Sequence, residues 1–182
     1  MVDFVRWLAP VALVPVAVLA APHCYAAQYL TLAQAQAAMF PEAREFAPVP
    51  VRLSRDQARE IEQLTGVQVR VQEQQVWQVR AVEGPIGWFI VDEVYGKHEL
   101  ITYAVGLNAD GSVRQIEVMD YRETYGYEIR NPAWRRQFSG KRQGDPLKLE
   151  QDIRNISGAT LSCRHITEGV KRLLAFHQVV LR

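Results

Sequence analysis

Apolar residues recur at helical spacing toward both ends of the chain. Residues 30–40 show this spacing and predict a short amphipathic helix. A second helix is expected from Ser54 to Gly66, because Ser54 and Gln57 resemble a capping box. Gly66 also stands where helices commonly end. The strongest helical pattern covers residues 161–178.

In the middle of the chain, apolar and polar residues alternate, which is typical of half-buried strands. Strands are expected over residues 67–71, 76–82, 86–93, 99–107 and 113–119. Short connections separate them, so consecutive strands should run antiparallel. This order of elements predicts an α+β fold, in which helices flank one antiparallel β-sheet.

Two further segments have weaker patterns. Residues 47–51 contain two prolines and predict a linker or an extended strand. Asn131 and Pro132 are typical of the first positions of a helix, so a short helix that carries Phe138 should follow. With 182 residues, the chain is expected to form one compact domain.

The first residues are typical of an exported protein. A run of Ala, Val, Leu and Pro covers residues 9–21, and small residues follow near Ala26. Pro10 and Pro15 interrupt the run, which is shorter than the ~20 residues of a membrane-spanning helix. We therefore expect a cleaved signal peptide over residues 1–26 and a periplasmic protein without a stable membrane span. An uncleaved N-terminal anchor is the alternative.

Composition narrows the function classes. The net charge of +1 provides no long-range field for nucleic acid, so no nucleic-acid partner is expected. The apolar fraction of 48% and the charged fraction of 23% favour an ordinary globular protein over a disordered chain. The sequence contains no Cys-x-x-Cys pair, Walker loop or nucleophile elbow, so no catalytic residue is assigned.

Other reactive side chains give weaker signals. After cleavage, Cys163 would be the only cysteine, either a reactive thiol near a helix N-terminus or a buried inert thiol, and we favour the buried thiol. His165 and Glu168 lie one helical turn apart and could ligate a metal. Without a third ligand nearby we favour a solvated pair and predict no metal site. His98 is interpreted as a turn residue.

One segment carries specific chemistry. Residues 157–160, Ser-Gly-Ala-Thr, lead into the last predicted helix. Free backbone N–H groups and the positive end of the helix dipole favour a phosphate at such a position, and Gly158 and Ala159 add little bulk. The alternative from local chemistry is that Ser157 or Thr160 is simply the N-cap of the helix.

The same four residues resemble the flavinylation motif of the FMN-binding domain family. This domain occurs in the G subunit of Rnf complexes and in the C subunit of the sodium-pumping NADH:quinone reductase. Residues 123–126 are similar to the family's Glu-Thr-Pro-Gly, and residues 138–141 match its Phe-x-Gly-Lys. The resemblance covers residues 86–174, about half of the chain, and leaves residues 30–82 without a match.

The resemblance implies covalent FMN, joined through its phosphate to the hydroxyl of Thr160 by an ApbE-type flavin transferase that uses FAD and Mg²⁺. It also implies an FMN-binding domain over residues 83–182, preceded by an N-terminal helical and β extension over residues 27–82 and the signal peptide over residues 1–26. The implied cofactor-binding residues are Thr160, Ser157, Gly158, Ala159, Leu161, Glu123, Thr124, Tyr125 and Gly126.

The chain departs from the family pattern at two places. The family usually has Asp three residues before the Ser, where this chain has Arg154. Asp152 lies two positions earlier, so either the register is shifted or flavinylation is weakened. Tyr125 and Tyr127 replace small and aliphatic residues, and they could either stack on the flavin ring or pack in the core.

The leading hypothesis is an exported electron-transfer flavoprotein that relays electrons between membrane and periplasmic redox proteins. Such a chain is a substrate of the flavin transferase and not a self-contained enzyme. A second hypothesis is a sensory or regulatory domain that binds flavin or another ligand without a covalent bond. A third is an envelope interaction protein without flavin, which Arg154 keeps open.

Overall fold

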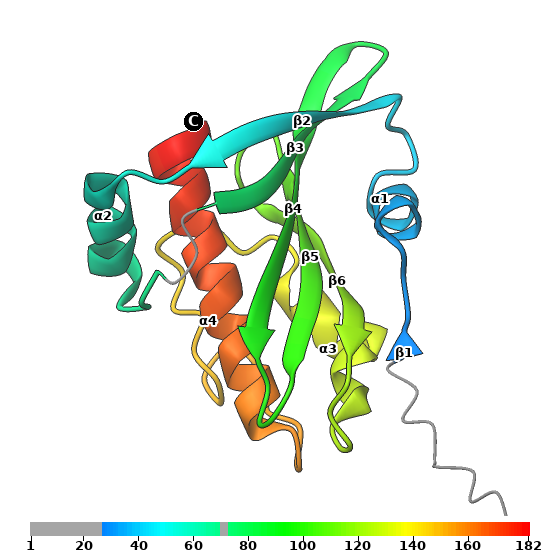
Figure 1. The fold of residues 1–182 in the computed structure, drawn as a ribbon, viewed down its shortest axis with the longest axis vertical. Helices are drawn as coiled ribbons and strands as arrows, with labels where there is room; N and C mark the ends of the chain where they lie inside the picture. Colours follow the sequence, from blue (N-terminus) through cyan, green and yellow to red (C-terminus); the bar gives the residue numbers. More distant parts are fainter. Residues whose placement is uncertain (1–26, 70–72) are drawn as a thin grey trace, which may run out of the picture.

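The computed structural model describes residues 27–69 and 73–182, so the predicted signal peptide lies outside the described residues. The chain forms a six-stranded antiparallel sheet flanked by helices, which confirms the predicted α+β fold (Figure 1). The strands are β1 (Ala27–Gln28), β2 (Glu45–Arg52), β3 (Glu73–Ala81), β4 (Gly84–Tyr95), β5 (Leu100–Asn108) and β6 (Val113–Tyr121). The main helices are α1 (Leu32–Met39), α2 (Arg55–Thr65), α3 (Pro132–Arg135) and α4 (Thr160–Phe176).

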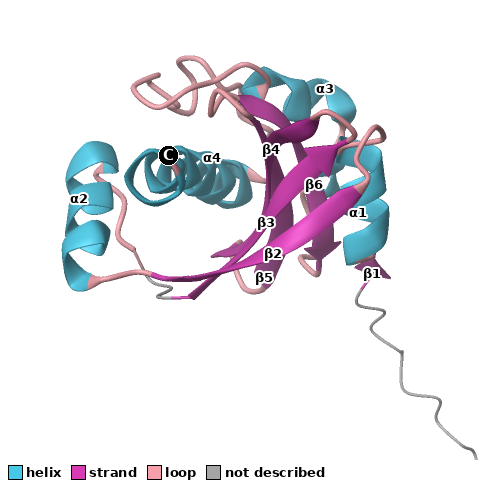
Figure 2. Cartoon of the chain, turned by 90° about the horizontal axis from the view of Figure 1, so that it is seen from above, coloured by secondary structure: helices cyan, strands magenta, loops and turns pink. Residues whose placement is uncertain are grey.

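The sheet has the order β1-β6-β5-β4-β3-β2, and different helices cover its two faces (Figure 2). On one face, Ala35 and Met39 of α1 pack in a cluster with Phe89 and Met119. The other face carries α4, with α2 packed beside α4 and α3 close to β6. This second face holds the larger part of the core.

Helix α4 is the main support of that core. The predicted apolar face is confirmed, because Ile166, Val170, Leu173 and Leu174 are all buried. Burial of one such side chain stabilises the fold by about 1.5–3 kcal/mol. A π-helical turn, His177–Leu181, continues the helix beyond its predicted end.

The local signals for helix starts are confirmed. Ser54 and Gln57 form the predicted capping box, with N···O distances of 3.1 and 3.0 Å. The side chain of Asn131 caps α3, which a 3-10 turn (Arg136–Phe138) extends. Residues 47–51 lie in β2, at the edge of the sheet, where prolines interrupt no further pairing.

The predicted strand over residues 67–71 is wrong where the structure describes it. Residues 67–69 form a loop after α2, and residues 70–72 lie outside the described residues. Side chains of α2 take the place of a neighbouring strand: Thr65 Oγ1 accepts from the N–H of Val67 and Glu62 Oε1 from that of Val69. The antiparallel partner of β3 on this side is β2.

The sheet order brings three distant segments to one end of the molecule. β5 lies between β4 and β6, so the β4–β5 turn at residues 96–99 lies near the segment that follows β6. The first turn of α4 lies at this same end, at the bottom of Figure 1. The sheet also continues across residue 82, the end of the predicted extension, because β3 and β4 pair along their length.

Candidate functional site

Helix α4 begins without a side-chain cap. Its N-cap is Ala159, a residue type that caps poorly, and neither Ser157 nor Thr160 accepts from the first turn. The alternative that one of them is the N-cap is therefore wrong. Within the described residues, the backbone N–H groups of Thr160, Leu161 and Ser162 have no hydrogen-bond partner. Three unsatisfied donors at the positive end of the helix dipole favour a bound anion.

A cavity of about 340 Å³ opens beside this helix start. It brings together seven of the nine predicted cofactor-binding residues, while Ser157 and Gly126 lie outside its lining. The lining residues are Lys97, His98, Glu123, Thr124, Tyr125, Gly158, Ala159, Thr160, Leu161 and Ser162. The cavity therefore lies between the helix start, the β4–β5 turn and the segment after β6.

Glu123 holds the β4–β5 turn against the site. Its Oε1 accepts from the backbone N–H groups of Lys97, of His98 at 2.6 Å and of Glu99 at 3.1 Å. Burial raises the pKa of Glu123, but these three hydrogen bonds outweigh it and hold the pKa below its ordinary value. A Cβ on Gly96 would overlap the Glu123 carboxylate, so a larger residue there would displace this side chain.

Gly126 and Tyr121 fix the segment after β6 to the start of α4. Gly126 has a φ of +89°, and a Cβ there would lie 2.5 Å from the Cβ of Ala159. The hydroxyl of Tyr121 donates to the carbonyl of Tyr125 and lies 3.5 Å from Ser162 Oγ. Gly126 thus lets the segment after β6 approach Ala159, a lining residue of the cavity, closely.

The two tyrosines of this segment are on the surface. Tyr125 is 77% exposed and Tyr127 is 65% exposed, so the alternative that both pack in the core is wrong. Tyr125 lines the cavity, whereas Tyr127 begins the following 3-10 turn (Tyr127–Arg130). An exposed ring at the cavity mouth is suited to contact a planar ligand.

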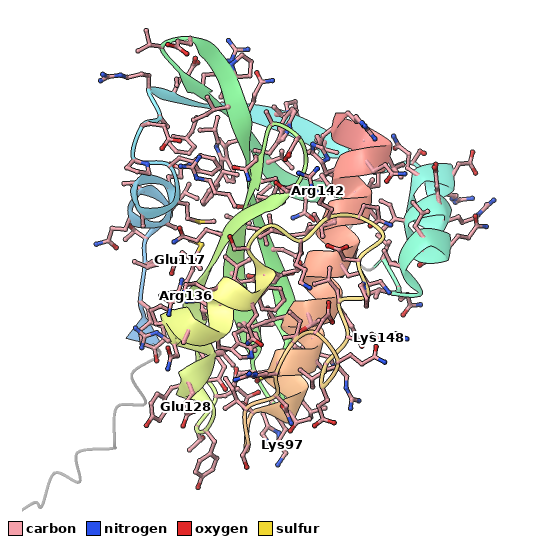
Figure 3. The ribbon with its side chains drawn as sticks, turned by 180° about the vertical axis from the view of Figure 1, so that it is seen from behind. Lys97, Glu117, Glu128, Arg136, Arg142 and Lys148 are labelled. Atoms are coloured by element: carbon pink, nitrogen blue, oxygen red, sulfur yellow. The ribbon has the colours of Figure 1, made fainter. Side chains whose placement is uncertain are left out.

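Thr160 is exposed and lies on the rim of two cavities. The second cavity, of about 400 Å³, is lined by three basic side chains, Lys148, Arg164 and Lys171, and by two acidic ones, Glu150 and Glu168. Figure 3 shows Lys97 and Lys148, one from each cavity, on loops beside the beginning of α4. Each lining thus offers at least one lysine to a phosphate at the hydroxyl, together with acidic side chains.

Asp152 and Arg154, where the sequence departs from the family pattern, both make defined contacts. Asp152 accepts from Lys141 Nζ at 2.9 Å and from the backbone N–H groups of Leu147 and Lys148. It therefore organises the loop before the motif. Arg154 is held through its backbone, which bonds Gln137 and Trp134, and its side chain is exposed.

Cys163 and His165, the other reactive side chains considered in the sequence, make contacts within the fold. Cys163 is fully buried and burial raises the pKa of its thiol, which fits the inert thiol that the sequence favours. His165 Nδ1 lies 2.5 Å from the carbonyl oxygen of Tyr95. In the part of the chain that the structure describes, no three His, Cys, Asp or Glu side chains form a metal-binding group.

Sequence reasoning missed five residues of this site, and one of them, Ser162, directly follows the predicted Leu161. Lys97 and His98 enter it only through the sheet order, far from the motif in sequence, although His98 does lie in a turn as predicted. Tyr121 has the signature of an ordinary strand residue. Asn155, whose Nδ2 lies 3.0 Å from Thr160 Oγ1, is five positions before the threonine and could have been noted as a polar neighbour of the motif.

The fold of this chain resembles that of a known protein. The chain is similar to the crystal structure of Shewanella oneidensis NqrC, with a TM-score of 0.50 and 17% sequence identity. The similarity covers 79% of this chain and 74% of that chain, and at this identity it shows a common fold. No curated protein matches the sequence.

The model of the FMN-binding domain matches residues 96–175. This segment includes the whole lining of the 340 Å³ cavity, from the β4–β5 turn to the first turn of α4. Residues 96–175 of this chain are therefore similar to the FMN-binding domain family.

Proposed function

We propose that this chain is an exported electron-transfer flavoprotein that carries FMN in a phosphoester bond to Thr160. An ApbE-type flavin transferase attaches the FMN from FAD. The loaded protein relays electrons between membrane and periplasmic redox partners. The observation that carries the proposal is the uncapped start of α4, where an exposed threonine hydroxyl adjoins three unpartnered N–H groups.

The residues present fit FMN at this position. The N–H groups of Thr160, Leu161 and Ser162 suit the phosphate, and Lys97 adds positive charge. The cavity of about 340 Å³ has the size of a small-molecule site, about 300–1,000 Å³. Tyr125 and Thr124 offer it an aromatic ring and a hydroxyl.

When bound, the flavin supplies the electron chemistry, and the protein supplies attachment, orientation and electrostatics. Outside the cytoplasm little free FMN is present for rebinding, so a non-covalent cofactor would be lost by dissociation. A phosphoester retains the cofactor at any concentration. This requirement supports covalent attachment in an exported protein.

Export rests on the N-terminal sequence pattern, which is typical of a signal peptide over residues 1–26. Among the helices of residues 27–69 and 73–182, none is long and apolar enough to cross a membrane. Fractionation of cells that produce the full chain tests this part. Mature protein in the periplasmic fraction, shortened near Ala26, is expected, and full-length protein in the membrane would indicate a retained anchor.

The decisive experiment is intact mass of the chain after co-expression with an ApbE-type transferase. The parent should gain about 438 Da, the mass of FMN less water. A Thr160→Ser variant keeps a hydroxyl and should gain the same mass, whereas Thr160→Ala should gain none. Reversible bleaching of the yellow product by dithionite and its rapid reoxidation would support electron transfer.

Other outcomes favour the rival functions. A parent that stays colourless and gains no mass would overturn the flavoprotein proposal and favour the flavin-free interaction module. Flavin that is released on denaturation, and that alters binding to a membrane partner, would favour the sensory domain. Equal mass gain on parent and Thr160→Ala would place the bond on another residue.

A further inference from the structure

The hydroxyl of Thr160 behaves differently from other threonine hydroxyls at helices of this protein. Thr65 Oγ1 donates to the carbonyl of Ile61 at 2.7 Å, and Thr167 Oγ1 donates to that of Cys163 at 2.6 Å. Both follow the usual bond of a helical threonine to the carbonyl four residues earlier. Thr160 makes no such bond within the described residues, and its Oγ1 instead lies 3.0 Å from Asn155 Nδ2.

The orientation of the Asn155 amide is fixed from both sides. Its Oδ1 accepts from the backbone N–H of Ile156 at 2.9 Å, so its Nδ2 must face the other way. Nδ2 lies 3.0 Å from Thr160 Oγ1 and 3.4 Å from Glu150 Oε1. An acceptor on each side of Nδ2 and a donor at Oδ1 leave one assignment of the amide.

The direction of the hydrogen bond matters for chemistry. An amide NH₂ can only donate, so Thr160 Oγ1 must be the acceptor. The proton of the Thr160 hydroxyl is therefore uncommitted in the described part of the chain. A fixed donor also holds Oγ1 in one rotamer, where a helical threonine would otherwise divide between two.

We propose that Asn155 is a positioning residue for the attachment of FMN to Thr160. This inference rests on the proposed function. In the transfer, a bond forms between Thr160 Oγ1 and the FMN phosphorus. The bond from that phosphorus to the bridging oxygen of the FAD pyrophosphate breaks, and AMP leaves with this oxygen. The hydroxyl proton passes to a base of the transferase.

Negative charge develops on Oγ1 as this proton leaves. The N–H of Asn155 already points at Oγ1, so it stabilises this charge without reorganisation. It also presents the hydroxyl in a single orientation. Asn155 acts within the acceptor chain and not on the transferase, so its loss should slow the transfer step and leave the encounter of the two proteins unchanged.

The test is the initial rate of mass gain for purified full-length chain with transferase, FAD and Mg²⁺, at a series of chain concentrations. Asn155→Asp keeps the acceptor for the Ile156 N–H, removes the donor that faces Thr160 and Glu150, and adds one negative charge. It should lower kcat roughly ten- to a hundredfold with KM unchanged, as loss of a hydrogen bond to a charged group predicts. Asn131→Asp is the matched control, because either side chain caps a helix, and it should keep the parent rate.

A second pair of variants controls for the change in net charge. Glu150→Gln removes the neighbouring negative charge but keeps an oxygen that can accept from Asn155 Nδ2, so it should keep the parent rate. Glu150→Gln with Asn155→Asp should be as slow as Asn155→Asp alone. Parent kcat in either Asn155→Asp protein, or a loss confined to KM, would overturn the positioning role. No mass gain on the parent would instead overturn the proposed function itself, and with it this inference.

Discussion

Thr160 and Thr167 lie on the same helix, about two turns apart, and have opposite surroundings. Thr160 is exposed, and its hydroxyl accepts a hydrogen bond from Asn155. Thr167 is 2% exposed, and its hydroxyl donates to a backbone carbonyl. The first turn of α4 leaves polar groups available, whereas the body of the helix satisfies them internally. The helix therefore combines a reactive end with a supporting body, and the two should respond to different substitutions.

The largest effect is expected in the body of the helix, at Arg172. Its Nη2 lies 2.5 Å from Asp92 Oδ2, both side chains are buried, and the hydroxyl of Tyr103 donates to the same oxygen. Arg172→Ala leaves the Asp92 carboxylate without its cation and should cost about 3–5 kcal/mol in the free energy of unfolding. Urea denaturation followed by circular dichroism measures this loss.

The paired variant Arg172→Met with Asp92→Asn is the control for Arg172. It removes both charges and keeps an acceptor for Tyr103, so much of the lost stability should return. The folded fraction of each variant should still gain FMN. Failure of folded Arg172→Ala to gain FMN would show that the body of the helix also takes part in attachment. The two parts of α4 would then not have separate roles.

The next effect is expected at Gly126, where the two regions meet. Gly126→Ala forces a left-handed φ on alanine and presses its Cβ on Ala159, so it should cost about 1–3 kcal/mol and reduce FMN incorporation. Gly140→Ala is the matched control, because its φ is +78° and nothing lies within 4 Å of the added Cβ. Denaturation and mass gain of both variants separate backbone strain from the contact with Ala159. Equal behaviour of the two would show that the contact is unimportant.

A smaller and more specific effect is expected at the two threonines. Thr167→Val removes one buried hydrogen bond and should cost about 0.5–1.5 kcal/mol in stability, with FMN incorporation at the parent level. Thr160→Val should leave the free energy of unfolding within about 0.5 kcal/mol and abolish incorporation, because its side chain is exposed and caps nothing. Thermal denaturation measures the stability of each variant, and intact mass measures its FMN incorporation. A large loss of stability in Thr160→Val would contradict the view that Thr160 serves FMN attachment and does not stabilise the helix.

The comparison also explains which features could be predicted from sequence. Helix α4 and the motif before it are local patterns, and so are the capping box at Ser54 and the N-cap at Asn131. The loop at residues 67–69 was mistaken for a strand because its alternating valines bond to side chains of α2, which periodicity does not reveal. Strand β1, two residues long, gives no pattern at all.

The site itself was predictable only in part. Residues 123–125 and 158–161 were found through the family resemblance, and the structure places them around one cavity. Lys97 and His98 reach that cavity because β4, β5 and β6 are neighbours, which the local sequence does not encode. The direction of the Asn155 amide depends on two bonds that only coordinates provide.

The smallest effect concerns pH and the far end of the helix. Burial lowers the pKa of His177 below 6.5, Arg182 lowers it further, and Asp110 opposes both. The unfolded state therefore binds more protons as the pH falls below about 6.5, so stability falls with decreasing pH in that window. The neutral ring packs against Trp88 and Gly111, where a charged ring would be poorly solvated.

His177→Gln removes this titration. Between about pH 7.5 and about pH 5.5 the parent should lose more unfolding free energy than His177→Gln, by up to about 1 kcal/mol. Thr160→Val should show the parent's full pH dependence, because the open first turn contributes nothing to it. Urea denaturation at both pH values measures the change in the free energy of unfolding. An identical change in the parent and in His177→Gln would mean that another group titrates. A pH dependence that is retained by Thr160→Val and reduced by His177→Gln would show that acid destabilises the far end of the helix without a contribution from its first turn.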